Sequence, residues 1–177
     1  MIREGKIRPH HFRGVATIVS KLFNAIQPDV AFFGQKDIQQ CVVIKNLIRD
    51  LLFPIEMEVV ETMRESDGLA MSSRNRYLDS EQRQRAPMLY KAMCLIKNAV
   101  ENDQVKDAEA LIKMAKAYLE QENQVSLEYL SIADPMNLQE LQTIHGPAIL
   151  SGALRVGKTR IIDNLLLNLK LKEFNKF

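Results

Sequence analysis

One short stretch decides the fold: Val30-Ala31-Phe32-Phe33-Gly34-Gln35-Lys36-Asp37. Its first four residues form an unbroken apolar run, which is typical of a strand buried on both faces, as in a parallel sheet. Gly34 ends this run, and apolar residues at helical spacing follow from Lys36 to Leu52, just before Pro54. The stretch therefore predicts a buried strand that passes directly into a helix.

The segments on either side extend this pattern. Apolar residues recur at helical spacing from His10 to Gln27, and Pro28 ends that helix. The residues from Ile55 to Thr62 alternate as in a second strand. Helix, strand, helix, strand is the order of a doubly wound α/β sheet. Since two strands cannot form an independent sheet of this kind, we expect residues 1–63 to be the C-terminal part of a nucleotide-binding α/β domain.

The remainder of the chain, residues 64–177, has a different pattern. A polar segment from Arg64 to Leu78 predicts a loop, and Gly157-Lys158 is a turn signal between two strands. We expect a small α+β domain that includes a phosphate-binding loop at 64–76. Its predicted helices and strands are helices at 80–101 and 106–122 and strands at 125–132, 148–155 and 159–164.

The composition narrows the class of protein. With 46% hydrophobic and 26% charged residues over 177 positions, the chain can bury a core as a soluble globular protein does. The net charge of +2 gives no reason to expect a nucleic acid or a membrane as partner. No run approaches the roughly 20 apolar residues of a membrane span. Cys41 and Cys94 lie apart in apolar stretches, which favours free thiols and a cytoplasmic location.

The first group of candidate site residues follows the predicted strand, at Phe33-Gly34-Gln35-Lys36-Asp37-Ile38-Gln39-Gln40. In open α/β sheets ligands bind beyond the carboxyl ends of the strands, and helix N-termini attract anions. Gly34 allows close approach of a ligand, Lys36 offers a cation for phosphate, and Asp37 can accept from ribose hydroxyls. Gln40 lies one helical turn after Lys36 and can face the same site. The alternative is an ordinary strand–helix junction with a capping Asp.

The second group lies in the polar loop, where Ser72, Ser73 and Arg74 follow Gly68. Two hydroxyls and a guanidinium suit a polyphosphate, and a loop can close over a nucleotide. The alternative is a solvated linker between domains.

Two further groups carry weaker signals. His10 and His11 are neighbours, so on a helix they point about 100° apart and cannot chelate one metal ion well. We expect no metal site there, and a contact from one histidine to an anionic ligand or a backbone carbonyl instead. Asp163-Asn164, inside an apolar strand, is expected to satisfy buried backbone groups without a catalytic role.

Three motifs occur in order and at compatible spacing: Arg8-Pro-His-His-Phe-Arg-Gly-Val, Phe33-Gly-Gln-Lys-Asp-Ile-Gln-Gln and Asp67-Gly-Leu-Ala-Met-Ser-Ser-Arg-Asn. Together with Arg160-Ile-Ile-Asp-Asn near the end, they resemble the C-terminal part of the pantoate–β-alanine ligase (pantothenate synthetase) family. The resemblance implies a nucleotidyltransferase-like fold, here a partial Rossmann-like sheet followed by the α+β domain.

The resemblance also implies a reaction and a set of residue roles. Pantoate attacks the α-phosphate of Mg-ATP to give pantoyl adenylate, and β-alanine then displaces AMP to form pantothenate. Gln40 would bind pantoate, and His11 would approach the site. Lys36, Ser72, Ser73 and Arg74 would be catalytic. The ATP contacts would be Phe33, Gly34, Lys36, Asp37, Met63, Met71, Ser72, Ser73 and Arg74.

One family element has no counterpart in this sequence, the Thr-Met-Gly-x-Leu-His-x-Gly-His motif whose histidines steady the transition-state phosphate. We therefore expect little or no ligase activity from this chain alone. Either the sequence is cut short or a second chain completes a split protein. The alternative function is a non-catalytic nucleotide-binding or scaffolding remnant, and a ligase for another acid is a further one. The family resemblance also implies a homodimer for the intact enzyme.

Overall fold

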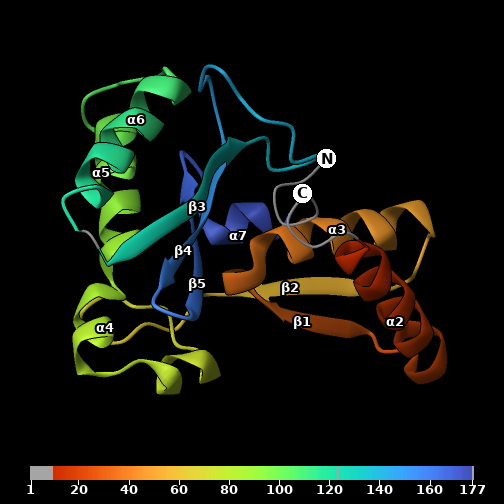
Figure 1. Ribbon diagram of the computed structural model, residues 1–177. Helices are drawn as coiled ribbons and strands as arrows, with labels where there is room; N and C mark the ends of the chain where they lie inside the picture. The colour runs from red at the N-terminus through yellow and green to blue at the C-terminus, as the bar shows by residue number, and fades with distance from the viewer. Residues whose placement is uncertain (1–9, 123, 177) are drawn as a thin grey trace.

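A computed structural model of the chain describes residues 10–122 and 124–176 (Figure 1). Arg8 and Pro9 of the first motif lie outside the described residues. The chain forms a mixed α/β fold with two separate sheets, one parallel and one antiparallel. This architecture confirms the predicted order of a Rossmann-like part followed by an α+β part. The exact division at residue 63 stays a prediction.

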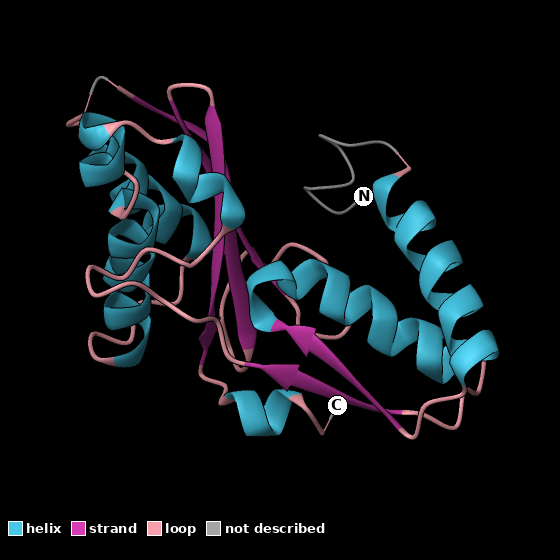
Figure 2. Ribbon diagram, turned by 90° about the horizontal axis from the view of Figure 1, so that it is seen from below, coloured by secondary structure: helices cyan, strands magenta, loops and turns pink. Residues whose placement is uncertain are grey.

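The parallel sheet contains β1 (Val30–Gly34) and β2 (Glu56–Val60), paired so that Ala31 lies opposite Met57. The helices α2 (His11–Ile26) and α3 (Ile38–Asp50) lie on one side of this sheet (Figure 2). Met57 and Val59 are buried against α3, with Ala31 and Phe33 packed beside them. The parallel pairing of β1 with β2, with α3 between them in sequence, agrees with the predicted strand–helix–strand unit.

The prediction that β1 is buried on both faces is wrong. Phe32 is 69% exposed and Val30 38% exposed, whereas Phe33 packs into the core on the other face. Among the described strands β1 pairs with β2 alone, and the helices cover one face of this small sheet. The apolar run Val30–Phe33 therefore has an apolar outer face that no described element buries.

The antiparallel sheet has the order β3 (Val125–Ala133), β4 (Ala148–Val156) and β5 (Thr159–Leu167). Gly157 and Lys158 form the turn between β4 and β5, as predicted, and β5 runs three residues beyond its predicted end. The helices α5 (Met88–Glu101) and α6 (Ala108–Leu119) pack against this sheet and form the larger hydrophobic core.

The single helix predicted at 80–101 is wrong, because the chain forms two helices there. The first, α4 (Ser80–Arg85), begins at Asp79, whose side chain accepts a hydrogen bond from the backbone N–H of Gln82 at 2.8 Å. Pro87 follows, and α5 starts after it. Proline lacks the N–H that an unbroken helix needs, which explains the break. A short 3-10 helix, η2 (Ser73–Tyr77), also lies inside the predicted loop.

A second, smaller hydrophobic core contains residues from both parts of the chain. Ile149 of β4, Leu166 of β5 and Phe174 of the terminal helix α7 (Leu171–Phe174) are buried together with residues of α3 and β2. Next to α7, the Asn175 side chain bonds to β2: its Oδ1 accepts from Val59 N at 2.9 Å, and its Nδ2 donates to Val59 O at 3.2 Å. These contacts fix the two sheets relative to each other.

Two predictions about the whole chain can be compared with the structure. Both cysteines are free thiols, as predicted. Within the described residues, every helix is too short or too polar to cross a bilayer.

Candidate functional site

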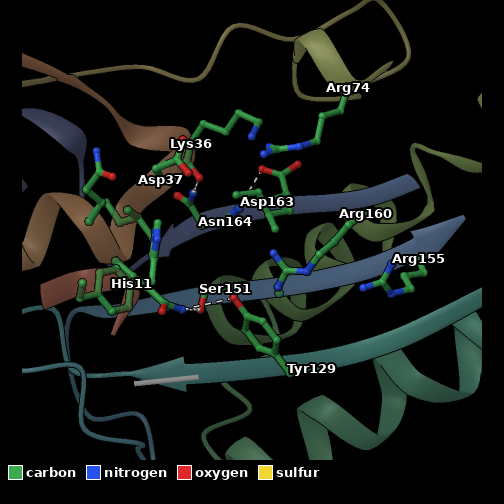
Figure 3. A pocket seen from close by; sticks show the side chains of 16 residues that line it. His11, Lys36, Asp37, Arg74, Tyr129, Ser151, Arg155, Arg160, Asp163 and Asn164 are labelled. Carbon is green, nitrogen blue, oxygen red and sulfur yellow. Dashed lines mark hydrogen bonds between the residues drawn. The ribbon is translucent and has the colours of Figure 1, made fainter. Parts of the chain in front are cut away.

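A pocket of about 640 Å³ lies where the two sheets meet (Figure 3). This volume is within the usual range for small-molecule sites. The N-terminal part contributes one wall and the antiparallel sheet the other. The lining residues are His11, Phe12, Lys36, Asp37, Ile38, Gln39, Gln40, Arg74, Tyr129, Ser151, Gly152, Arg155, Arg160, Ile162, Asp163 and Asn164.

The first wall comes from the end of β1. A 3-10 turn, η1 (Gln35–Asp37), joins this strand to α3, so that Lys36 and Asp37 reach the pocket directly from the carboxyl end of the strand. Gln40 lines the same pocket one turn later, as the spacing predicted, and His11 joins it from α2. Asp37 occupies the N-cap position of α3 but makes no capping hydrogen bond with its side chain. A purely capping role therefore does not explain this aspartate.

Phe33 and Gly34 do not line this pocket. The Phe33 side chain packs against the core around α3. Gly34 has φ −77° and needs no left-handed backbone, but a Cβ added there would meet no atom within 4 Å. The space beside Gly34 is open, as close approach of a ligand would require.

The polar loop forms a small ribbon before it reaches the pocket. Arg64 and Ala70 form an antiparallel bridge, and Met71 N donates to Met63 O at 2.9 Å. Met63 and Met71, at the open end of this ribbon, are thus neighbours with 71% and 55% of their surface exposed. Arg74 lines the pocket, whereas Met63, Met71, Ser72 and Ser73 lie outside it.

Ion pairs hold the loop in shape. Arg83 of α4 bonds to Glu65 at 3.0 Å and also to Asp67. The hydrogen bond from Arg83 lowers the pKa of Asp67 below its usual value. Gly68, which follows Asp67, has φ +93°, and a Cβ there would collide with the ring of Tyr90. A glycine is therefore required at this turn.

The second wall was not predicted from the sequence. Tyr129, Ser151, Arg155 and Arg160 reach the pocket from the three antiparallel strands. Gln39 donates to Ser151 Oγ at 3.1 Å and to Tyr129 OH at 3.3 Å, which links the start of α3 to this sheet. The available signal was the presence of charged and hydroxyl side chains within otherwise apolar strands.

Asp163 and Asn164 do more than the sequence indicated. Asn164 does satisfy backbone groups, as predicted, because its Nδ2 donates to Gln35 O at 2.8 Å and to Lys36 O at 3.0 Å. Asp163 accepts from the backbone N–H of Asn164 at 2.7 Å and also receives two hydrogen bonds from Arg64, at 2.6 and 2.9 Å. Both residues also line the pocket.

The charge of the pocket suits an anion. Lys36, Arg74, Arg155 and Arg160 are cationic, against the carboxylates of Asp37 and Asp163. Figure 3 shows Lys36, from η1, and Arg74, from η2, pointing toward one another. Arg155 and Arg160 share one carboxylate, Glu128, each at 2.6 Å. The surplus of cations favours a polyphosphate or a carboxylate as ligand.

No group of three or more His, Cys, Asp or Glu side chains that could hold a metal ion occurs within 10–122 and 124–176. His11 lines the pocket, and His10 precedes α2 in a left-handed conformation with φ 68°.

Comparison with known proteins identifies the family. The model of the family described as pantoate-beta-alanine ligase matches residues 1–166. The chain belongs to the pantoate–β-alanine ligase family. Among curated members of this family, the pantothenate synthetase of Herpetosiphon aurantiacus is 54% identical over 165 residues, covering 93% of this chain and 59% of that protein. The pantothenate synthetase of Moorella thermoacetica is 47% identical, covering 92% and 57%.

Solved structures of pantoate–β-alanine ligases share the fold. The enzyme from Thermus thermophilus superimposes with a TM-score of 0.85 at 43% identity, over 92% of this chain and 58% of that one. The Francisella tularensis ligase, described as complexed with beta-gamma ATP and beta-alanine, gives a TM-score of 0.66 at 30% identity, over 95% and 55%. The chain thus spans less than two thirds of the length of these relatives.

Proposed function

We propose that this chain takes part in the ATP-dependent joining of pantoate to β-alanine through a pantoyl-adenylate intermediate. The observation that carries the proposal is the meeting of Lys36, Asp37, Gln40 and Arg74 in one cationic pocket. These residues come from two motifs about 35 positions apart in sequence, so their convergence supports a common ligand. The Francisella relative, described as a complex with an ATP compound and β-alanine, supports this choice of substrates.

In the first step, a pantoate carboxylate oxygen attacks the α-phosphorus of ATP and the bond to the pyrophosphate oxygen breaks. Lys36 and Arg74 offset the negative charge that builds on the phosphates, which is the main contribution a protein makes to such a transfer. Asp37 accepts hydrogen bonds from the ribose hydroxyls, and Gln40 holds pantoate. We propose that the nucleotide extends beyond this pocket to the backbone of Phe33 and Gly34, where the space beside Gly34 is open, and that His11 assists from α2.

The serines of the loop act after ATP has entered. Ser72 and Ser73 lie outside the pocket, and Ser72 Oγ accepts a hydrogen bond from Arg74 N at 3.3 Å. We propose that the loop moves inward, so that both hydroxyls contact phosphate together with Arg74. Met63 and Met71, already joined by a backbone hydrogen bond, then provide an apolar surface for adenine.

In the second step, the β-alanine amine attacks the acyl carbon of the adenylate, AMP leaves, and the amine loses a proton. Mg²⁺ would be bound together with ATP through phosphate oxygens and water, which with one or two carboxylates are its usual ligands in such sites. Asp163, the other carboxylate of the pocket besides Asp37, is already bound by Arg64 at two points, so phosphate and water would supply most of the ligands. The ion would neutralise charge on the phosphates.

We further propose that this chain has little activity by itself, because no His-x-Gly-His element occurs in its sequence. Residues 1–63 would form the C-terminal part of the nucleotide-binding α/β domain, and residues 64–177 the C-terminal α+β domain that includes the phosphate-binding loop at 64–76. A cytoplasmic location and a homodimer complete the proposal, and light scattering on a sizing column tests the dimer. The alternative is a remnant that binds ATP and forms no adenylate.

Pantoate-dependent ATP–pyrophosphate exchange tests the proposal. The purified chain, shown to be folded by circular dichroism, is compared with Lys36→Ala. Lys21→Ala, a change at an exposed lysine of α2, is the matched control. Exchange that requires pantoate and is lost only in Lys36→Ala supports the proposal. Ligase turnover on the order of 1 per second would contradict the expected low activity.

If Lys36→Ala binds ATP as tightly as the wild type does, the pocket around Lys36 is not the nucleotide-binding site. ATP binding without exchange would favour the remnant. Adding the N-terminal half of a pantoate–β-alanine ligase then distinguishes an incomplete enzyme from a non-catalytic remnant. An incomplete enzyme should regain exchange, and a remnant should not.

A further inference from the structure

Two adjacent residues of β5 contact both segments that carry the proposed nucleotide-binding residues. Asn164 bonds to the turn at Gln35 and Lys36, and Asp163 bonds to Arg64 at the start of the polar loop. We infer that Asp163 and Asn164 are positioning residues that hold Lys36 and the loop of Arg74 in register for one ligand. This inference rests on the proposed function and adds residues to it.

The Asn164 contacts fix the backbone around Lys36. Asn164 is 1% exposed, and its Nδ2 donates to the carbonyl oxygens of both Gln35 and Lys36. These two carbonyls belong to the peptide units on either side of the Lys36 Cα. Since peptide units are planar, holding both of them fixes φ and ψ of Lys36 and therefore the direction in which its Cα–Cβ bond leaves the backbone. The Asn164 Oδ1 also accepts from Gln35 Nε2 at 3.2 Å, which orients the amide.

The Asp163 contacts fix the start of the loop in the same way. Its carboxylate binds the Arg64 guanidinium at two points, and Arg64 in turn donates to Gly68 O at 3.0 Å. The guanidinium also stacks over the Tyr90 ring, 4.0 Å from its centroid. The ribbon that precedes Ser72 and Arg74 is thus anchored at its first residue to β5.

One rigid strand therefore sets the distance between two otherwise separate loops. Asp163 Oδ1 accepts from Asn164 N at 2.7 Å, so the two side chains are also ordered relative to each other. Buried amides and carboxylates inside a strand destabilise a fold unless their hydrogen bonds are complete. Here those bonds lead to the proposed site residues, which explains their presence in an apolar strand.

The test measures ATP affinity by calorimetry for Asn164→Ala and Asn164→Asp, with Asn98→Ala, an exposed helix position, as matched control. Loss of the buried donor should weaken ATP binding by about tenfold. Lys36→Ala is measured in parallel. If the wild-type chain binds ATP, Lys36→Ala does not, and both Asn164 variants bind normally, the inference is overturned while the proposed function stands.

A pH series separates positioning from a general loss of stability. In Asn164→Asp the ionised side chain has no donor for the two carbonyls, whereas the protonated form regains one. The ratio of variant to wild-type dissociation constants should therefore fall as the pH is lowered from 8 to 5. Lys36, Arg64 and Asp163, the charged groups around this position, are the same in both proteins. A constant ratio contradicts the inference.

Hydrogen exchange measured without ATP keeps the two hypotheses apart. Amides of residues 34–40 should exchange faster in Asn164→Ala than in Asn98→Ala. Unchanged exchange of these amides overturns the inference whatever the chain binds. Failure of the wild-type chain to bind ATP overturns the proposed function. The hydrogen-exchange rates of residues 34–40 then show by themselves whether Asn164 positions the backbone at Lys36.

Discussion

Arg64 and Asp163 form a two-point ion pair across the junction of the two sheets, with Nη1–Oδ2 at 2.6 Å and Nη2–Oδ1 at 2.9 Å. The Asp163 side chain is 3% exposed and that of Arg64 18% exposed. Burial alone would lower the pKa of the Arg64 guanidinium, but the hydrogen bonds and charge of Asp163 raise it above its usual value. The guanidinium therefore stays charged throughout the accessible pH range.

Asp163→Asn should destabilise the fold strongly, because it leaves the buried Arg64 charge without its partner. Breaking a buried pair on one side costs about 3–5 kcal/mol. Urea unfolding followed by circular dichroism measures the change. Asp67→Asn, which breaks a more exposed pair with Arg83, is the comparison and should cost about 1 kcal/mol or less. Equal losses in the two variants would show that burial does not set the cost.

The Asp67–Arg83 pair should make stability depend on acidity. The pKa of Asp67 is lowered in the folded state, mainly by the hydrogen bond from Arg83. Its contribution is therefore present above the ordinary carboxyl pKa and is lost as the pH falls through the lowered value. The stability difference between wild type and Asp67→Asn should shrink between pH 5 and pH 2. A stability difference that stays constant over this pH range would contradict the prediction.

Gly68→Ala and Gly14→Ala should have opposite effects on the melting temperature. Gly68 has φ +93°, and a methyl group there meets the Tyr90 ring, so alanine should cost about 1–2 kcal/mol or more. Gly14 lies inside α2 with open space around it, and alanine should stabilise that helix by about 0.5–1 kcal/mol. Calorimetric melting of both variants checks the prediction. A Gly68→Ala protein that melts at the wild-type temperature or above would contradict the left-handed conformation of Gly68.

The two thiols should differ in reactivity. Burial, followed by the negative charge of Asp37, raises the pKa of Cys41 to about 12, whereas Cys94 is half-buried. At pH 8 Cys41 is protonated and covered, so a thiol reagent such as DTNB should modify Cys94 first. The Cys94→Ala variant should then react only after unfolding. Rapid modification of that folded variant would contradict the buried position of Cys41.

Sequence patterns predicted one half of the site and missed the other. Lys36, Asp37 and Gln40 could be placed because a strand end, a turn and a helical spacing are local features. Tyr129, Ser151 and Arg160 could not be placed, because antiparallel pairing brings them to the pocket from a distant part of the chain. The motifs of the polar loop predicted phosphate contacts, but only Arg74 reaches the pocket in this structure.

The fold was predictable to a similar degree. Hydrophobic periodicity placed each strand of the described residues within a few positions of its observed bounds. It could not show that one face of β1 is uncovered, since an apolar run does not specify what covers it. Pro87 was visible within the predicted helix at 80–101, and its missing N–H was sufficient reason to divide that helix in two. The short helix α7 has too few residues for a periodic pattern to be recognised.

The side chain of Asn175 has a consequence for how the parallel sheet can be extended. It occupies both the N–H and the C=O of Val59, which point away from β1, and so imitates a neighbouring strand. Exposed strand edges are where additional strands pair. With the Val59 position of the β2 edge taken, an extra strand can form a continuous ladder only beside β1. The parallel sheet can therefore be extended at one of its two edges only.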